Sequence, residues 1–217
     1  MIDKKDETLI TENPRSKITL NNNKVTKFYF GSDKFSRYKT EAGFYQSTKL
    51  SCIPFFHSAE VDDQIPLIKM SFLGERYPGF ISDEETKNLS PKDFEDIRTT
   101  LSYLLDSEIQ VHGDFAPHNI YLNKNNERTV MLVDWEDSFK TLDRSYLMYD
   151  YATLWSYLYI DDDKFVHTFK NFELPAIRKD GLLDNFLLNY KRKLMALLEH
   201  EKWRNRGPKL HDFILSL

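Results

Sequence analysis

The sequence predicts an α+β protein in which two lobes share a cleft. Its 217 residues exceed what one simple core needs and fall short of two full domains. Strand-like patterns dominate residues 1–75, whereas helical patterns dominate residues 76–217, and no internal repeat or linker separates the two parts. We therefore expect residues 1–75 to form a small lobe of β-sheet plus one helix, and residues 76–217 to form a helix-rich lobe packed directly against it.

Composition and charge narrow the class of protein. With 41% hydrophobic and 29% charged residues, and only 7 Gly and 8 Pro, the chain is unlike disordered or low-complexity sequences. No run approaches the roughly 18 apolar residues of a membrane span, and the first residues lack a signal-peptide core, so we expect a cytoplasmic protein without a transmembrane segment. The net charge of -4 argues against nucleic-acid binding, and the single cysteine, Cys52, fits a reducing compartment.

The first part of the chain predicts a hairpin, a helix and two further strands. Residues 1–16 are polar and contain Pro14, which indicates a loosely held arm. The runs SKITL and KVTKFYF flank the cluster NNN, a pattern typical of two strands joined by a turn. Apolar residues then recur every three or four positions, as in a one-sided helix: Phe35, Tyr38, Ala42 and Tyr45. Short strands are expected at Ile53–Phe56 and Pro66–Leu73.

The second part predicts one long helix, short strands and further helices. Ser90, Pro91 and Asp93 form a helix-start signature, and the apolar stripe that follows predicts a helix over 91–107. The runs QVHGD, NIYLN and TVMLVDW predict short strands around loops. Helical spacing then returns at Leu147–Ile160 and Leu182–Glu199.

The segment VHGDFAPHNIYLNKNNERTVMLVDWEDS carries a candidate catalytic site. Asn119 follows Asp114 by five residues, and Asp134 ends the later apolar run, which is the order of the kinase catalytic loop and metal-binding motif. Phosphoryl transfer needs a carboxylate that accepts the proton of the attacking hydroxyl, and oxygen ligands that hold Mg²⁺. These residue types in this order therefore indicate phosphoryl transfer.

The motif HGD-x-x-x-x-N, followed by DWE and then by YDYA, resembles the aminoglycoside phosphotransferase and choline kinase superfamily. Gly113 is typical of this small-molecule branch, since protein kinases have Arg at that place. The resemblance implies a bilobal protein-kinase-like fold, with a reduced nucleotide-binding β-lobe and a helical lobe that carries the catalytic loop. It implies a Mg²⁺-dependent transfer of the ATP γ-phosphoryl group to a hydroxyl of a small molecule, with Asp114 as catalytic residue and Asn119 and Asp134 as metal ligands.

The resemblance also implies a set of upstream residues. Strand alternation puts Val25 and Lys27 on one face, from which Lys27 can reach the nucleotide phosphates, while Lys24 and Lys34 remain alternatives. Glu41, fourteen residues after Lys27, is the expected ion-pair partner of the lysine.

Further supporting roles follow from the same resemblance. Backbone groups from Met70 to Leu73, including Phe72, are expected to contact the edge of the adenine base of ATP. His112 and Asp150 are expected to support the catalytic loop, and Glu136 adds a further carboxylate beside it. Acidic and aromatic residues near Asp114 favour a cationic or sugar-like acceptor, namely an amino alcohol, an amino sugar or a glycan precursor.

One departure from the family pattern leaves other functions open. No G-x-G-x-x-G lies between Ser16 and Phe30, so the glycine loop over the phosphates is missing or replaced by the NNN turn. A catalytically inactive, kinase-like binding module is therefore an alternative. A protein kinase acting on Ser, Thr, Tyr or itself is a second alternative, although Gly113 and the short interval between Trp135 and Asp150 argue against it.

Overall fold

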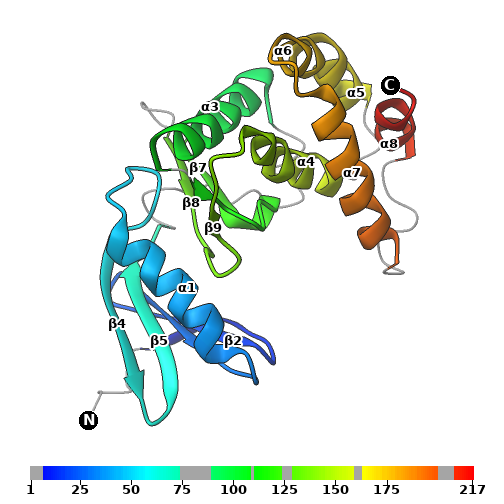
Figure 1. Cartoon of the computed structure of the whole chain (residues 1–217). Coiled ribbons are helices and arrows are strands. Elements are labelled where there is room, and N and C mark those ends of the chain that lie inside the picture. Colours follow the sequence, from blue (N-terminus) through cyan, green and yellow to red (C-terminus); the bar gives the residue numbers. More distant parts are fainter. Residues whose placement is uncertain (1–6, 74–88, 109, 124–128, 159–162, 200–207) are drawn as a thin grey trace.

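The computed structural model describes residues 7–73, 89–108, 110–123, 129–158, 163–199 and 208–217. Within these residues, a five-stranded antiparallel sheet and two two-stranded sheets combine with several helices, which confirms the α+β class. The large sheet lies at one end of the molecule and most helices lie at the other (Figure 1). The expected boundary near residue 75 falls outside the described residues, so the division of the chain there stays a prediction.

The large sheet is built from neighbouring hairpins. Its strands are β1 (Thr8–Glu12), β2 (Ser16–Asn21), β3 (Lys24–Tyr29), β4 (Phe56–Asp62) and β5 (Ile65–Ser71), in the order β1-β2-β3-β5-β4. Turns at Asn22–Asn23 and Asp63–Gln64 have left-handed backbone at both positions, which suits the twist of a two-residue hairpin. The expected hairpin of β2 and β3 is confirmed, and β5 overlaps the strand expected at Pro66–Leu73.

The two edge strands correct two expectations. The sequence predicts a loose arm for residues 1–16, yet Thr8–Glu12 pairs with β2 as a strand. The strand expected at Ile53–Phe56 is also wrong, because β4 begins at Phe56 and runs to Asp62. Most side chains of both strands are exposed or half-buried, so ladder hydrogen bonds rather than apolar burial hold them. An apolar pattern therefore cannot reveal them.

Helix α1 (Lys34–Ser47) packs on this sheet and brings two charged side chains into the interior. Its buried residues are Arg37, Glu41, Ala42, Phe44 and Tyr45. Phe35, which the apolar spacing places on the buried stripe, is 42% exposed, so that assignment is wrong. The buried face includes Arg37 and Glu41 because both side chains take part in the ionic cluster described below.

The helical part begins with α3 (Pro91–Glu108), which confirms the helix expected at 91–107. The Ser90 Oγ donates to Asp93 Oδ2 at 2.6 Å, and the Asp93 N–H donates to Ser90 Oγ at 3.3 Å, so the two residues cap this helix reciprocally. The other helices are α4 (Leu147–Tyr157), α5 (Asp163–Thr168), α6 (Leu174–Lys179), α7 (Leu183–Leu198) and α8 (Pro208–Leu215), and a π-helical turn (Phe169–Glu173) joins α5 to α6.

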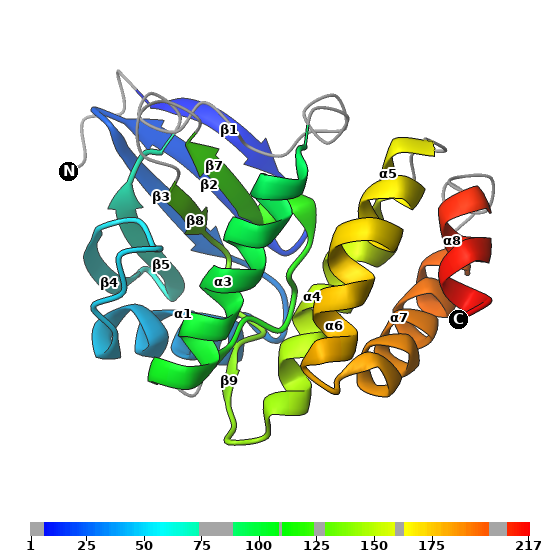
Figure 2. The ribbon, with the colours of Figure 1, turned by 90° about the horizontal axis from the view of Figure 1, so that it is seen from above.

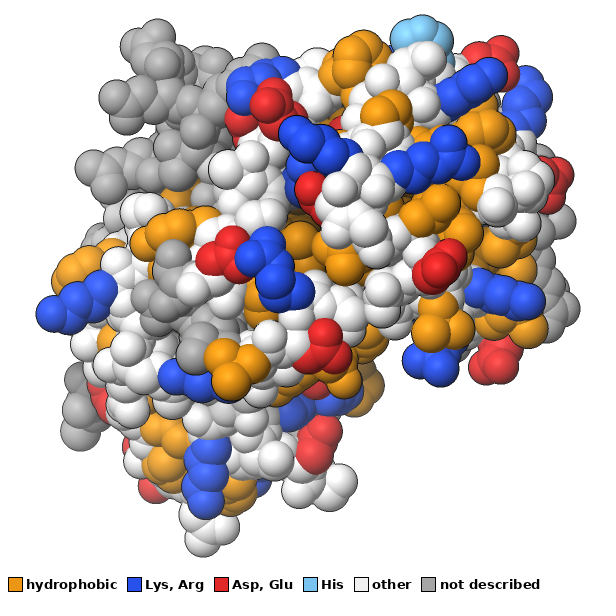
Figure 3. Space-filling model, turned by 45° about the horizontal axis from the view of Figure 1, so that its top comes forward, with side chains coloured by type: hydrophobic (Ala, Val, Ile, Leu, Met, Phe, Trp, Pro, Cys, Tyr) orange, Lys and Arg blue, Asp and Glu red, His pale blue; other side chains and the backbone are white. Residues whose placement is uncertain are grey.

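Figure 2 shows α4, α6, α7 and α8 beyond α3, on the side away from the large sheet. Helices α4 and α7 overlap the helices expected at Leu147–Ile160 and Leu182–Glu199. None of the described helices is long and apolar enough to cross a membrane. On the face drawn in Figure 3, Lys and Arg side chains lie among acidic and apolar ones.

The described residues of the second part also contain four short strands, and an aromatic stack next to them contacts the first part. Strand β6 (Gln110–Val111) pairs with β9 (Phe139–Lys140), and β7 (Ile120–Asn123) pairs with β8 (Thr129–Leu132), which confirms the strands expected from QVHGD, NIYLN and TVMLVDW. Trp135, just after β8, is fully buried and stacks on Phe44 of α1 with ring centroids 3.8 Å apart. The stack holds the segment after β8 against α1, so residues of both parts meet there.

Candidate active site

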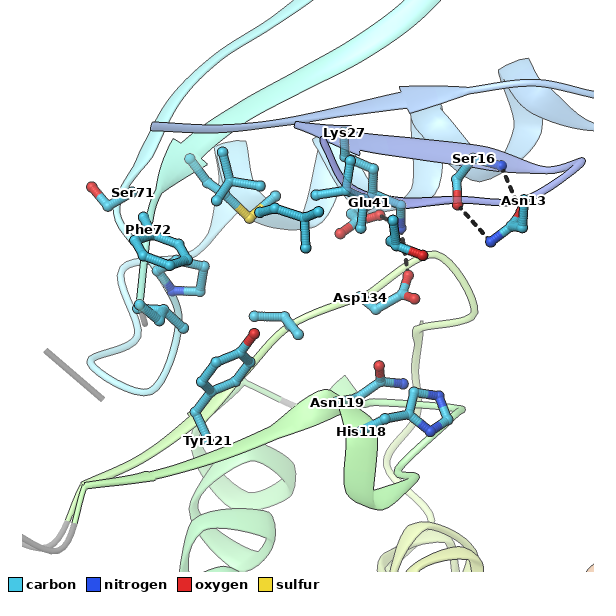
Figure 4. A pocket seen from close by; sticks show the side chains of 18 residues that line it. Asn13, Ser16, Lys27, Glu41, Ser71, Phe72, His118, Asn119, Tyr121 and Asp134 are labelled. Carbon is cyan, nitrogen blue, oxygen red and sulfur yellow. Dashed lines mark hydrogen bonds and ion pairs between the residues drawn. The ribbon is translucent and has the colours of Figure 1, made fainter. Parts of the chain in front are cut away.

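A cavity of about 570 Å³ lies between the large sheet and the β7–β8 hairpin (Figure 4). Residues expected from the sequence line it, namely Lys27, Glu41, Asn119, Asp134 and the segment from Met70 to Leu73 that includes Phe72. At one end, Figure 4 shows Phe72 and Tyr121 facing across the opening, while Lys27, Glu41 and Asp134 gather at the other end. The cavity is thus largely apolar at one end and charged at the other.

Three carboxylates surround the ammonium of Lys27, which is 4% exposed. Its Nζ lies 2.7 Å from Glu41 Oε2, 2.5 Å from Asp134 Oδ1 and 3.1 Å from Glu136 Oε2. Strand β3, helix α1 and the segment after β8 each contribute to this cluster, which brings together residues more than a hundred positions apart. The structure thus places Lys27, Glu41, Asp134 and Glu136 side by side.

Lys27 and Asp134 stabilise each other's charge, whereas burial raises the pKa of the Glu41 carboxyl. Burial alone would lower the pKa of the Lys27 ammonium, but Glu41, Asp134 and Glu136 outweigh burial and raise that pKa. Burial would likewise raise the pKa of the Asp134 carboxyl, but Lys27 holds that pKa below its ordinary value. We therefore treat Lys27 and Asp134 as an ion pair at neutral pH.

The two alternative lysines lie elsewhere. Lys24 begins β3 and is exposed to solvent. The Nζ of Lys34 lies 5.2 Å from the ring centroid of Phe35, on the exposed side of α1. Of these three candidates, Lys27 is the one that lines the cavity.

A 3₁₀ turn (Pro117–Asn119) brings Asn119 back to Asp114. The Asn119 Nδ2 donates to the Asp114 backbone oxygen at 2.9 Å and to Asp114 Oδ2 at 3.3 Å. These contacts fix the amide, and Figure 4 shows its oxygen directed across the cavity towards Asp134. The structure therefore brings Asn119 and Asp134 to one end of the cavity, with Asp114 behind Asn119 and not itself among the lining residues.

Buried Asp150 on α4 holds the loop that contains His112, Gly113 and Asp114. Its two carboxylate oxygens accept the backbone N–H groups of His112 at 2.7 Å and Gly113 at 3.0 Å. Burial lowers the pKa of the His112 imidazole, so the ring is neutral and its Nε2 can donate to the Val133 backbone oxygen at 2.9 Å. His112 thereby connects the loop of Asp114 to the residue before Asp134.

Replacing Asp150 with Asn should destabilise the protein in a pH-dependent way. An amide has one acceptor oxygen, so one of the two backbone N–H groups loses its partner, at a cost of about 1–3 kcal/mol. Burial also raises the pKa of Asp150 from 3.8 to about 7, although the two N–H donors oppose this shift. Between these values the folded chain carries a proton that the unfolded chain lacks, so the contribution of Asp150 to stability is lost as pH rises through this window.

Denaturant unfolding of wild type and Asp150→Asn from pH 4 to pH 7 measures this effect. The difference between their unfolding free energies should become smaller as pH rises. Asp163→Asn, which changes an acid whose side chain is 88% exposed, serves as the control. A difference that stays constant over this range would contradict the assigned titration.

Three features of the site were missed in the sequence. Fully buried Tyr29 donates its hydroxyl to Glu41 Oε2 at 2.5 Å, and buried Arg37 binds Glu136 Oε2 at 3.1 Å. Tyr29 lies two positions after Lys27, so strand alternation gives a signal for it. Arg37 lies four positions before Glu41, so both side chains lie on the same face of α1. A charged residue on a helix is nevertheless ordinarily assigned to the surface.

The third missed feature is the turn between β1 and β2. From the sequence, the glycine loop is either missing or replaced by the NNN turn, and no residue of that turn lines the cavity. The turn that lies beside Asp134 is 13–15, since Asn13 lines the main cavity and Asn13, Pro14 and Arg15 line an adjoining cavity of about 450 Å³. Asn23 of the NNN turn instead accepts the Phe72 backbone N–H at 2.9 Å, next to the segment expected to meet adenine.

Two residues, Asp134 and Asn119, offer oxygen atoms that could bind a metal ion. Oxygens of Glu41, Asp134 and Glu136 lie within 4.8 Å of one another, but the Lys27 ammonium contacts all three carboxylates. A metal ion at their centre would therefore compete with Lys27. The carboxylate of Asp134 and the amide oxygen of Asn119 both face the cavity, and such hard oxygen ligands suit Mg²⁺.

The chain belongs to the phosphotransferase enzyme family, whose model matches residues 56–183, more than half of the sequence. This match is consistent with the resemblance to aminoglycoside phosphotransferases and choline kinases. No curated protein matches the chain. The matched range contains Asp114, Asn119 and Asp134 but neither Lys27 nor Glu41. That Lys27 and Glu41 belong to the same site as Asn119 and Asp134 is therefore shown by the cavity that all four residues line.

Proposed function

We propose that this phosphotransferase moves the γ-phosphoryl group of ATP, in a Mg²⁺-dependent reaction, to a hydroxyl of a small molecule. One observation carries the proposal. The cluster of Lys27, Glu41 and Asp134 meets Asn119 at one end of the cavity, and Asn119 is hydrogen-bonded to Asp114, which is not itself among the residues lining the cavity. Family membership supports phosphoryl transfer, and this convergence supports its location.

The cavity suits a nucleotide in size and polarity. A volume of about 570 Å³ lies in the range of small-molecule sites. Val25, Met70 and Leu73 offer apolar surface for a base, whereas Lys27, braced by Glu41, offers a cation for the phosphates. Asp134 and Asn119 would hold Mg²⁺, which supplies charge neutralisation on the transferring phosphoryl group when bound. An ATP-consuming reaction also agrees with the cytoplasmic location expected from the sequence.

Asp114 is the proposed catalytic base. Its carboxylate orients the acceptor hydroxyl and accepts its proton as the new O–P bond forms. The bond between the γ-phosphorus and the bridging oxygen breaks, and ADP leaves. Transfer is direct and in line, and it relies on positioning and electrostatic stabilisation rather than on a covalent enzyme intermediate.

The surroundings of Asp114 support a cationic or sugar-like acceptor. Burial and then the charges of Glu136, Asp114 and Asp134 raise the pKa of Asp137, which places a further carboxyl in this region. The Asp114 charge also helps to raise the pKa of Tyr157, after burial. Carboxylates beside an aromatic ring suit an amino alcohol, an amino sugar or a glycan precursor.

An ADP-release screen tests the proposed function. The wild-type protein is incubated with MgATP and each of a set of amino alcohols, amino sugars, nucleosides and polysaccharide precursors. At least one acceptor should raise ADP release above the acceptor-free rate, and EDTA should abolish the increase. Phosphate found on protein by intact-mass measurement would instead favour a protein kinase. Absence of MgATP binding at millimolar concentration in calorimetry would favour a binding module.

A further inference from the structure

In the turn between β1 and β2, the backbone N–H groups of Asn13, Arg15 and Ser16 are already hydrogen-bonded within the turn. The Asn13 Oδ1 accepts the backbone N–H of Arg15 at 2.8 Å and that of Ser16 at 2.9 Å, and the Asn13 N–H donates to the Ser16 backbone oxygen at 2.9 Å. A glycine-rich loop binds phosphates through such N–H groups. Here the Asn13 side chain occupies the position that a phosphate oxygen would need.

The backbone of the same turn is anchored to its neighbours. The Arg15 backbone oxygen accepts the Phe30 N–H at 2.7 Å and the Arg37 Nη2 at 2.9 Å. Arg37 is buried and also binds Glu136, so it cannot release this oxygen without losing charged hydrogen bonds. Turning the N–H groups of the turn towards a nucleotide would therefore break several hydrogen bonds at once.

The side chain of Arg15, by contrast, is held only by contacts that it can exchange. It is 58% exposed, and its Nη2 lies 3.1 Å from Asp33, which is 48% exposed, and 3.8 Å from Glu136. The Arg15–Asp33 pair is exposed on both sides and contributes little stability, and the 3.8 Å approach to Glu136, whose side chain is 13% exposed, is too long for a hydrogen bond. Exchanging these contacts for another anion therefore costs little. When Arg15 leaves, Glu136 keeps its contacts with Lys27 and Arg37.

Arg15 also lies where phosphates are expected. It lines the adjoining cavity of about 450 Å³ together with Asp134 and Glu136, and Asp134 lines the main cavity as well. The two cavities therefore meet at the carboxylate that we propose as a metal ligand. A guanidinium at this junction can bind phosphate oxygens through two parallel N–H groups.

We propose that Arg15 binds the phosphate chain of the nucleotide with its guanidinium and so replaces the backbone contacts of a glycine-rich loop. The inference rests on the proposed function. It assigns to a side chain the phosphate contact that this rigid turn cannot make with its main chain.

Calorimetric titration of the full chain, without any acceptor, tests this assignment. MgATP, MgADP and adenosine are titrated into wild type, Arg15→Ala, Arg15→Lys and the control Lys39→Ala, which removes an exposed cation of α1 that lines neither cavity. Arg15→Ala should weaken MgATP and MgADP binding by about 10-fold or more and leave adenosine binding unchanged. Arg15→Lys should restore part of the loss, and Lys39→Ala should bind like wild type.

The outcomes separate this inference from the proposed function. If wild type and Arg15→Ala bind MgATP equally well, Arg15 is not a phosphate ligand, although the proposed function stands. Equal weakening of adenosine and MgATP would show that the substitution distorts the cavity, and it would also overturn the assignment. A wild-type protein that does not bind MgATP at all would overturn both.

Discussion

Replacing Asp114 with Asn should lower the turnover number by about 10²–10⁴-fold, the contribution typical of a general base. The amide has nearly the shape of the carboxylate but cannot accept the proton of the acceptor hydroxyl. The hydrogen bond from Asn119 Nδ2 to the Asp114 backbone oxygen, at 2.9 Å, does not involve the altered side chain. The loop should therefore keep its conformation, and folding and MgATP binding should be preserved.

The measurement compares turnover with the best acceptor, the thermal unfolding midpoint and the MgATP affinity of wild type and Asp114→Asn. Asp163→Asn makes the same chemical change at a side chain that is 88% exposed and far from the loop in sequence, and it should match wild type in all three. Unchanged turnover of Asp114→Asn would rule out Asp114 as the base. Lost turnover together with lost stability would point to a structural role instead.

Replacing Gly113 with Ala should have the largest effect on stability. Gly113 has a φ of +90°, and a Cβ built there would lie 2.1 Å from the backbone oxygen and 2.7 Å from the carbonyl carbon of Asp137. A backbone obstacle cannot rotate away as a side chain can. The left-handed conformation costs about 1–2 kcal/mol, and overpacking costs about 1–3 kcal/mol more, so a loss of roughly 2–5 kcal/mol is expected together with loss of activity.

Two other glycines separate the causes of this effect. Gly181 also has a positive φ of +69°, but its Cβ would meet nothing within 4 Å, so Gly181→Ala should show the conformational cost alone. A Cβ at helical Gly43 would also meet nothing within 4 Å, and Gly43→Ala should stabilise by up to about 1 kcal/mol. Urea unfolding gives all three values. Equal losses for Gly113→Ala and Gly181→Ala would show that the loop can relax away from Asp137.

Strong local signals allowed much of the fold to be predicted from the sequence. Helix α3 has an apolar stripe and a reciprocal cap at Ser90 and Asp93, and the β2–β3 hairpin has an asparagine turn between β-branched runs. Strands β1 and β4 were misassigned because they are the edges of the sheet and expose most of their side chains. Their positions depend on pairing with distant residues, which local patterns do not record.

In the candidate site, too, some residues have a local signal in the sequence, whereas others depend on contacts between distant segments. Asp114, Asn119 and Asp134 lie in one contiguous motif whose spacing is set by a hairpin, so the sequence predicts their convergence. Strand alternation after Lys27 points to Tyr29, whereas Arg37 enters the site only because α1 packs against β3, and an arginine carries no local signal of burial. The turn beside Asp134 follows β1, a strand that the sequence does not reveal, so the sequence does not point to that turn.

The ionic network around Lys27 also has a consequence for electroneutrality. Four carboxyl groups, those of Asp33, Glu41, Asp134 and Glu136, are linked to three cations, those of Lys27, Arg15 and Arg37. Burial raises the pKa of Glu41 and so favours its neutral form, but with Glu41 neutral or ionised the network has no excess of positive charge. A metal-free nucleotide would bring several more negative charges into this region, where partial burial strengthens repulsion. The proposed donor should therefore enter only with its countercharge, and the dependence on a divalent cation would follow from the charge balance of the protein itself.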